Sequence, residues 1–400
     1  MTVGAVDLAD PHTYSRHDPH AIWRRLRADD PVHWQHAEGD RPGFWVLTRY
    51  ADVQAVFKDN RAFTSERGNV LATLLAGGDS AAGRMLAVTD GARHRDLRYV
   101  MLKALSPRAL DQVGDKVRAN TDRLVAAAAE RGRCDFAADV AERIPITTIC
   151  DLLGVPAADH ETLLRLTKSA LSSERPDAQA LDEVAARNEI LLYFADLVDE
   201  RRARPQDDVI TALAQSRIDG RLLDEDDIVL NCYSLIIGGD ETSRLSMIGS
   251  LAAFIEHPEQ WRRLKHGEVT VAAAAEEVLR WTSPAMHFGR TVLAELDWAG
   301  HRFRAGDIVT VWISSANRDE RQFDDPDVFD LGRTPNRHLT FGFGPHFCLG
   351  AHLGRVEIAA LLDALRRHVG EIRPDGEPQR LYSNVLAGYS RLPVVLAGGA

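Results

Sequence analysis

The sequence is poor in the features that mark secreted and membrane-spanning proteins. It has four cysteines in 400 residues, and their positions (134, 150, 232 and 348) follow no paired spacing. A disulfide framework is therefore not expected, and the pattern suits a reducing compartment such as the cytoplasm. No stretch approaches the ~18 apolar residues that a membrane-spanning helix needs. The opening MTVGAVDLADPHTY lacks the basic and apolar regions of a signal peptide.

Positive charge is also scarce. The chain has 48 Lys and Arg against 59 Asp and Glu, a formal net charge of −11. This balance disfavours nucleic acids and anionic membrane surfaces as general partners. Hydrophobic residues make up 45% of the chain, which allows a substantial core. A length of 400 residues is within the range of one large domain. We therefore expect a single domain over residues 1–400.

One of the four cysteines stands in an unusual setting. The stretch 338–357, HLTFGFGPHFCLGAHLGRVE, places Cys348 in a glycine-rich loop directly before apolar residues at helical spacing. A helix N-terminus favours a thiolate. We expect Gly342 and Gly344 to adopt backbone angles that other residues resist, and Gly350 to let the helix approach a flat, bulky object.

Four interpretations of this loop compete. Cys348 could be a buried structural cysteine, or the nucleophile of a phosphatase-type loop, although Arg355 is one residue too far away and Phe347 replaces the expected histidine. Cys348 and His352 could begin a zinc site, but a second pair of ligands is lacking. The fourth interpretation is an axial ligand of haem iron. It explains the largest number of fixed positions in ten residues: Phe341, Gly342, Gly344, His346, Cys348 and Gly350.

This motif resembles the haem-binding signature of the cytochrome P450 superfamily. The resemblance implies haem b held without a covalent bond, with Cys348 as the axial iron ligand and with Phe341 and Gly350 among the cofactor-binding residues. It also implies a mainly α fold with a small β-rich lobe, in which the haem is buried between a long central helix and the cysteine loop. With the motifs described below, the resemblance covers the chain from about His20 to the C-terminus.

The longest helical pattern runs from Asp224 to Glu256, with an acidic start and an apolar middle that predicts burial. Within it, Gly238 and Gly239 cost roughly 1 kcal/mol each relative to alanine. The polar residues 240–242 add a desolvation cost. Close helix packing with the polar side chains turned outward, or a distorted turn beside a ligand, would each account for this stretch.

The same stretch, Gly-Gly-Asp-Glu-Thr, resembles the distal-helix motif of the family. The resemblance places Glu241 and Thr242 at the oxygen-activating positions, as the catalytic residues that guide protons to bound oxygen. This chain has Glu241 where many members have aspartate.

Two basic residues four apart, His94 and Arg98, share one face of a helix predicted over Asp90–Leu105. For an isolated pair, a solvated basic face would be the simpler interpretation. Beside the cysteine loop, the pair resembles the family's HxxxR motif, which binds the haem propionates. The resemblance makes Arg290 and His346 further propionate ligands.

A second pair, Glu277 and Arg280, lies three apart on a helix predicted over Val271–Trp281. Alone it indicates only a surface ion pair worth a few tenths of a kcal/mol. Together with Arg333 it is similar to the Glu-Arg-Arg network of the family, which holds the fold and is not catalytic.

The resemblance also implies a substrate pocket, covered by the segment Thr64–Thr89, which lacks clean periodicity. The candidate lining is apolar, which predicts a medium-sized, largely apolar secondary metabolite as substrate. An acyl or aminoacyl group tethered to a carrier protein is the alternative. The candidate lining residues are Leu235, Gly238, Met286, Phe288 and Leu386.

The chain shows no flavin or nicotinamide domain, so we expect electrons from NAD(P)H to arrive through an external reductase and a ferredoxin. Residues 91–108 carry five basic side chains against one acid. This is either a solvated face or, by resemblance, the dock for an acidic ferredoxin. The expected reaction inserts one oxygen atom from O2 by hydroxylation or epoxidation. A peroxygenase, an oxidative-coupling enzyme and a non-catalytic haem sensor are the alternatives.

The remaining patterns predict helices over His20–Asp29 and Tyr50–Lys58 and a helix-dominated region over residues 109–204. Residues 204–220 are expected to form a polar connector. Strands are predicted over 31–36, 43–48, 290–297, 301–303, 308–313 and within 381–396.

Overall fold

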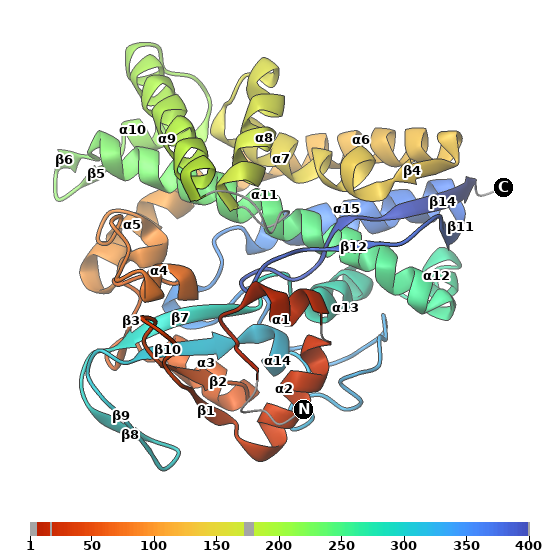
Figure 1. Cartoon of the computed structure of the whole chain (residues 1–400). Helices are drawn as coiled ribbons and strands as arrows, with labels where there is room; N and C mark the ends of the chain where they lie inside the picture. Colours follow the sequence, from red (N-terminus) through yellow and green to blue (C-terminus); the bar gives the residue numbers. More distant parts are fainter. Residues whose placement is uncertain (1–5, 17, 172–179, 399–400) are drawn as a thin grey trace.

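The computed structural model describes residues 6–16, 18–171 and 180–398, with the side chain of Ala180 left out. Figure 1 shows most of the helices gathered on one side of the molecule and a β-rich lobe with the N-terminal elements on the other. In the described ranges, no helix combines the length and the apolar character needed to cross a membrane. The prediction of a mainly α fold with a small β-rich lobe is confirmed.

The central element is helix α11 (Glu225–Glu256), which crosses the middle of the molecule in Figure 1. It begins after an extended Asp224 and has three acidic residues in its first turn, as a helix N-terminus prefers. Helices pack around it on several sides, so its apolar residues are buried around most of its circumference. The packed neighbours are α7 (Arg143–Leu153), α8 (His160–Leu171), α9 (Ala180–Ala203), α13 (Val271–Thr282) and α15 (Ala351–His368).

Helix α6 (Pro107–Arg131) lies against α15 and extends the helical side of the molecule. The Ser106 hydroxyl accepts a hydrogen bond from the N–H of Ala109, and Pro107 occupies the first turn, where its missing N–H costs nothing. The helix ends at Gly132, whose φ of +75° favours glycine. A π-helical turn, η3 (Ala137–Ala141), then leads into α7.

The β-rich lobe is built on a five-stranded sheet in the order β1-β2-β10-β7-β3. Strand β10 (Ile308–Trp312) pairs in parallel with β2 (Phe44–Leu47) and antiparallel with β7 (His287–Val292). The outer strands are β1 (Val32–Gln35) and β3 (Phe63–Thr64). Every residue of β10 is buried, which explains its continuous run IVTVW in place of an alternating pattern.

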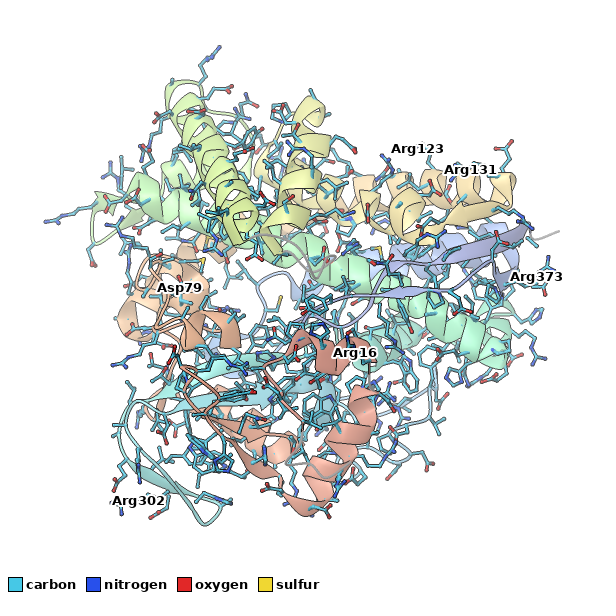
Figure 2. The ribbon with its side chains drawn as sticks, in the orientation of Figure 1. Arg16, Asp79, Arg123, Arg131, Arg302 and Arg373 are labelled. Carbon is cyan, nitrogen blue, oxygen red and sulfur yellow. The ribbon has the colours of Figure 1, made fainter. Side chains whose placement is uncertain are left out.

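Short helices cover this sheet, and smaller hairpins complete the fold. The covering helices are α1 (Pro11–Arg16), α2 (Pro19–Asp29), α3 (Tyr50–Lys58) and α14 (Ile313–Ala316). In Figure 2, Arg302 points outward from the hairpin of β8 (Leu296–Trp298) and β9 (His301–Phe303), at the far end of the molecule from Arg131 and Arg373.

The chain ends in a second small sheet. It joins β11 (Val369–Pro374) and β14 (Pro393–Gly398) to β4 (Arg133–Asp135), so the C-terminal strands pair with the segment that follows α6. The pairs β12 (Gln379–Arg380) with β13 (Tyr389–Arg391) and β5 (Arg217–Ile218) with β6 (Arg221–Leu222) are separate.

The structure corrects the prediction for residues 204–220. This segment is not only a polar connector, because it contains the buried helix α10 (Val209–Ala214). The Asp208 carboxylate caps α10 by accepting from the N–H of Thr211 at 2.7 Å. Six residues between acidic and basic neighbours are too few to show helical periodicity in the sequence.

Two further segments hold elements that the sequence did not reveal. The region 64–89 includes α4 (Leu71–Leu75) and the 3-10 turn η2 (Leu86–Val88). The helix-dominated region 109–204 contains strand β4, which is only three residues long. These elements could not be predicted because three to five residues are too few to show a hydrophobic period.

Candidate active site

The cysteine loop lies between a 3-10 turn, η5 (Gly344–His346), and helix α15. The N–H of Cys348 donates to the carbonyl of Phe341 at 2.8 Å, which closes the loop on itself. Gly344 has φ +72°, and a Cβ there would lie 2.6 Å from the carbonyl oxygen of Phe57, so only glycine fits. Gly350 is the N-cap residue of α15, and a Cβ at this position would lie 3.9 Å from the Cys348 sulfur, which is an ordinary contact distance.

The thiol of Cys348 is accessible, yet it is surrounded by protein at longer range. Its side chain is exposed. Burial by the surrounding protein is the largest influence on the thiol and raises its pKa above the ordinary value, and the Gly350 N–H and the charges of Arg98 and Arg355 offset this only in part. In the described part of the chain, no three His, Cys, Asp or Glu side chains gather as metal ligands, which leaves the zinc interpretation without support.

Four basic side chains predicted for the propionates come together beside this loop. The rings of His94 and His346 lie 4.3 Å apart between centroids. Arg98 Nη2 donates to the carbonyl of Phe347 at 2.7 Å, which ties α5 (Gly91–Ala104) to the cysteine loop. Arg290 is buried in β7, and its charge depresses the pKa of His346 in addition to the larger effect of burial.

This basic group has more donors than acceptors. His94 is 3% exposed, and its Nε2 has no hydrogen-bond partner among the described residues. Burial, followed by the charges of His346 and Arg98, lowers the pKa of His94 to about 4. Burial lowers the pKa of Arg290 to about 10. Two buried groups that charge reluctantly and face few acceptors fit a ligand that brings its own carboxylates.

Asp90 is a member of this group that the sequence did not suggest. Its Oδ1 lies 2.9 Å from His346 Nε2, and its Oδ2 accepts from the Ser65 N–H and the Thr64 hydroxyl, both at 2.7 Å. Burial raises the pKa of Asp90, but these hydrogen bonds outweigh it and hold the pKa well below its usual range. Asp90 occupies the N-cap position of α5, but its side chain makes no capping hydrogen bond.

The two glycines of α11 serve different purposes. A Cβ at Gly239 would lie 3.4 Å from Ile149 of α7, so this glycine allows close helix packing. A Cβ at Gly238 would meet nothing within 4 Å, and Gly238 is exposed in the middle of a buried helix. The helix itself is continuous, and the Thr242 hydroxyl donates to the Gly238 carbonyl at 2.8 Å. Thr242 therefore lies on the side of α11 that has open space.

Glu241 is held differently from its neighbour Thr242. It is 2% exposed and forms an ion pair with Arg244, one turn along α11, whose Nε lies 3.0 Å from Glu241 Oε2. Arg244 also contacts Glu142 at 3.2 Å. The Glu241 carboxylate is thus held by Arg244 among the packed helices. The catalytic roles predicted for Glu241 and Thr242 stay predictions.

The third predicted constellation, Glu277 with Arg280 and Arg333, is brought together by the fold. Glu277 and Arg280 are both fully buried and joined by two parallel hydrogen bonds of 2.8 Å. Arg333 Nε lies 3.3 Å from Glu277 Oε2. Arg280 and Arg333 also donate to backbone carbonyls of the segment 324–328. The network therefore fixes the chain that leads into the cysteine loop, as a fold-holding role requires.

Comparisons with known proteins agree with this geometry. Residues 175–387 match the family model described as cytochrome P450. The chain is 49% identical to cytochrome P450 NovI of Streptomyces niveus, covering 98% of this chain and 97% of the relative. The chain belongs to the cytochrome P450 family. It is also 31% identical to the steroid C26-monooxygenase of Mycobacterium tuberculosis (strain ATCC 25618 / H37Rv), over 98% of this chain and 93% of that protein.

The fold comparison gives the same answer. The crystal structure of P450 OxyD, described as involved in the biosynthesis of vancomycin-type antibiotics, superimposes with a TM-score of 0.90 at 37% identity. It covers 99% of this chain and 100% of that one. The protein is therefore a cytochrome P450 monooxygenase, a member of a family whose cofactor is haem.

The candidate pocket residues of this cytochrome P450 are spread over several cores. Leu386 packs with Leu245 of α11 and pairs through its backbone with Ala285. Met286 is 1% exposed and packs with N-terminal residues such as Trp23. Phe288 meets the ring of Phe57 at 6.3 Å. Leu235 and Gly238 lie on α11.

Some of the basic side chains of helix α5 are bound to other parts of the protein. Arg93 is ion-paired with Asp227, and Arg98 bonds the cysteine loop. Arg95 and Lys103 are exposed. Large apolar side chains are exposed beside them, namely Tyr99 (69%), Leu102 (49%) and Phe347 (40%) on the cysteine loop.

The sequence also failed to reveal the partner of this region on α13, just as it did not suggest Asp90. Arg355 of α15 donates to both carboxylate oxygens of Glu276, at 2.6 and 3.2 Å. Its guanidinium lies 4.5 Å from the centre of the Phe341 ring, in cation–π range. Glu276 also contacts His338 at 3.1 Å. The spacing of these residues in the sequence gave no signal, because Glu276 lies 79 positions from Arg355.

Proposed function

We propose that this cytochrome P450 inserts one oxygen atom from O2 into an organic secondary metabolite, by hydroxylation or epoxidation, with Cys348 as the thiolate ligand of haem iron. The observation that carries the proposal is the accessible thiol in a glycine-rich loop, next to a basic group in which the buried His94 Nε2 has no hydrogen-bond partner among the described residues. Residues 1–400 form one cytochrome P450 domain in this proposal.

The residues present fit haem b. Arg98 and Arg290 offer positive charge for two propionates, His94 and His346 offer hydrogen bonds, and Asp90 orients His346. When bound, haem with a thiolate ligand supplies the chemistry of oxygen activation. The Gly350 N–H and the nearby Arg98 and Arg355 favour the charged sulfur. Phe341 is held beneath the guanidinium of Arg355 and supports the loop.

Proton delivery is the role we assign to Thr242 and Glu241. The Thr242 hydroxyl lies on the side of α11 where Gly238 leaves space, so it can orient water or oxygen there. Glu241 sits one residue earlier as a carboxylate paired with Arg244. It can carry a proton toward Thr242 when that ion pair opens.

Electrons come from NAD(P)H through a reductase and an acidic ferredoxin, which we place on α5 and the cysteine loop. The exposed cations Arg95 and Lys103 supply attraction. Tyr99, Leu102 and Phe347 are exposed apolar side chains that would lose their water when ferredoxin binds, and so would form the apolar centre of the interface. Such partners, and the scattered free cysteines, fit a cytoplasmic enzyme.

The substrate class is inferred from the relatives. P450 OxyD is described as involved in the biosynthesis of vancomycin-type antibiotics, and a second similar structure, at 29% identity and a TM-score of 0.85, is described as one of the cytochrome P450-like monooxygenases involved in microbial secondary metabolism. A medium-sized, largely apolar metabolite remains our proposal. An acyl or aminoacyl substrate bound to a carrier protein is the alternative, and the two are separated by whether the free or the tethered compound shifts the Soret band.

Labelled oxygen tests the reaction itself. The haem-loaded enzyme is supplied with NADPH, a surrogate ferredoxin and reductase, a substrate that shifts the Soret band, and ¹⁸O2. The proposal requires one ¹⁸O atom in the product. Product without label would indicate oxidative coupling, label only from added peroxide would indicate a peroxygenase, and binding without product would indicate a sensor.

A further inference from the structure

Helix α11 carries a buried acid for which the proposed reaction has no use. Asp240 is 0% exposed and directly precedes Glu241. Its Oδ2 lies 2.9 Å from the hydroxyl of Thr167 on α8. Its Oδ1 is buried and has no hydrogen-bond partner within the described residues. A carboxylate in such a place would leave half of its charge without a partner.

The hydroxyl of Thr167 reveals which form of Asp240 fits. A threonine hydroxyl has one hydrogen to donate, and two oxygens lie within its reach, Asp240 Oδ2 and the Leu164 carbonyl at 3.0 Å. If Asp240 were ionised, both would be acceptors competing for the single hydroxyl hydrogen. If Asp240 is protonated, it donates to Thr167, which donates to Leu164, and every hydrogen in the chain is used.

The charges around Asp240 lead to the same conclusion. Among the described residues, this buried cluster contains three carboxyl groups and two cations. Glu142 is bound by Lys168 at 2.9 Å and by Arg244 at 3.2 Å, and Arg244 also holds Glu241. Both cations are thus engaged by the other two carboxylates. A negative charge on Asp240 would be in excess.

The acidity of Asp240 agrees with the geometry. Burial, followed by the negative charge of Glu241, raises the pKa of Asp240 to about 8, although the hydrogen bond of Thr167 and the charge of Arg244 lower it. On the α7 side, the titratable neighbour is Cys150, a thiol whose pKa is raised by burial and by Asp240. It offers no positive charge.

We propose that Asp240 is held as the neutral acid in the folded enzyme, so that this cluster stores one proton directly beside Glu241. Asp240 is then a positioning residue. While neutral it leaves Arg244 to Glu241 and Glu142, and when ionised it competes for Arg244 and loosens Glu241. Only this last step rests on the proposed role of Glu241 in proton delivery, because the location of the proton does not depend on catalysis.

Infrared spectroscopy of the haem-loaded enzyme tests where the proton is. The carbonyl stretch of a protonated carboxyl group is separate from the amide bands, and it disappears when the group ionises. We expect such a band at pH 6.5 in the wild-type enzyme, its loss near pH 8, and its absence in Asp240→Asn at every pH. An unchanged protonated-carboxyl spectrum in Asp240→Asn at pH 6.5 would overturn the proposal.

Glu357 provides the matched control. This acid of α15 is 3% exposed, and burial raises its pKa to about 7, although hydrogen bonds from Ser243 and Thr148 lower it. Glu357→Gln should remove a band that titrates near pH 7 and keep the Asp240 band. Thr167→Val removes the hydroxyl that contacts Asp240 Oδ2, so it should change the pH at which the Asp240 band disappears and leave the Glu357 band in place. An Asp240 band that titrates as in the wild type in Thr167→Val would contradict the assignment.

Coupling measurements test the positioning role separately. Product formed per NADPH is compared for wild type and Asp240→Asn between pH 6.5 and 9, with the same redox partners. We expect the wild-type yield to rise relative to the variant as pH rises through about 8, because only the wild type gains the extra charge that loosens Glu241 from Arg244. A ratio that stays constant over this range would refute the positioning role, and the infrared result would still decide the protonation state.

Discussion

Arg290 offers a way to separate haem binding from fold maintenance. It is 5% exposed and has no carboxylate within salt-bridge distance among the described residues. Burial lowers its pKa to about 10, well below its ordinary value. Because each pKa unit corresponds to 1.36 kcal/mol, keeping this guanidinium charged costs the protein without haem about 3 kcal/mol. A ligand carboxylate is what would offset that cost.

Replacing Arg290 with methionine should therefore affect the two forms of the protein in opposite ways. The haem-free protein is relieved of about 3 kcal/mol and loses the hydrogen bond to the Gly289 carbonyl, worth about 1 kcal/mol, so its stability should be unchanged or higher. The haem-bound protein loses a buried charge pair, which costs about 3–5 kcal/mol. Haem should dissociate on the order of 10²–10⁴ times more readily.

The assay combines haem transfer to excess apomyoglobin with urea unfolding of the haem-free protein. Arg280→Met serves as the control. Arg280 donates hydrogen bonds to Glu277 and to backbone carbonyls, so its replacement should destabilise the haem-free and haem-bound proteins alike. If Arg290→Met weakens the haem-free protein as much as the haem-bound one, Arg290 is a structural residue and the propionate assignment fails.

Three further predictions address other parts of the molecule. Thr242→Ala should retain haem and substrate affinity but lower the product formed per NADPH and raise peroxide release; an unchanged yield would make Thr242 structural. Glu277→Gln leaves Arg280 and Arg333 without a carboxylate and should destabilise the enzyme by about 3–5 kcal/mol in thermal or urea unfolding, whereas a loss below 1 kcal/mol would mean that the network contributes little. Arg95→Glu should slow reduction by ferredoxin at low salt and leave haem retention unchanged; equal rates for variant and wild type would move the dock away from α5.

The features that could be predicted from the sequence are those whose signal is local. Cys348 lies in a short motif with fixed glycines, and α11 has 32 residues of nearly continuous helical pattern. Gly238 and Gly239 were recognised as unusual, but only the structure shows that one packs on Ile149 and the other faces open space. Close packing is correct for Gly239, whereas the distorted turn is wrong because α11 is continuous, and the outward polar side chains are wrong because Asp240 and Glu241 are buried.

The features that could not be predicted depend on contacts between distant residues. Asp90 meets His346 across 256 positions, and Arg244 meets Glu142 across 102. No periodicity connects such residues, so the sequence indicates charged side chains without indicating their partners. The ion pair of Glu241 with Arg244 is local, because the two residues lie one turn apart on α11. Glu142, the second carboxylate that Arg244 contacts, lies 102 positions from Arg244, and the sequence gave no sign of it.

The most direct test of the account is the spectrum of the dithionite-reduced enzyme under carbon monoxide, recorded for wild type and Cys348→Ser. Wild type should give the red-shifted Soret band of a thiolate-ligated haem. Cys348→Ser should bind haem, because the propionate ligands remain, and give no such band. A Cys348→Ser protein that keeps the thiolate band, or a wild type that binds haem without it, would contradict the assignment of Cys348 as the iron ligand.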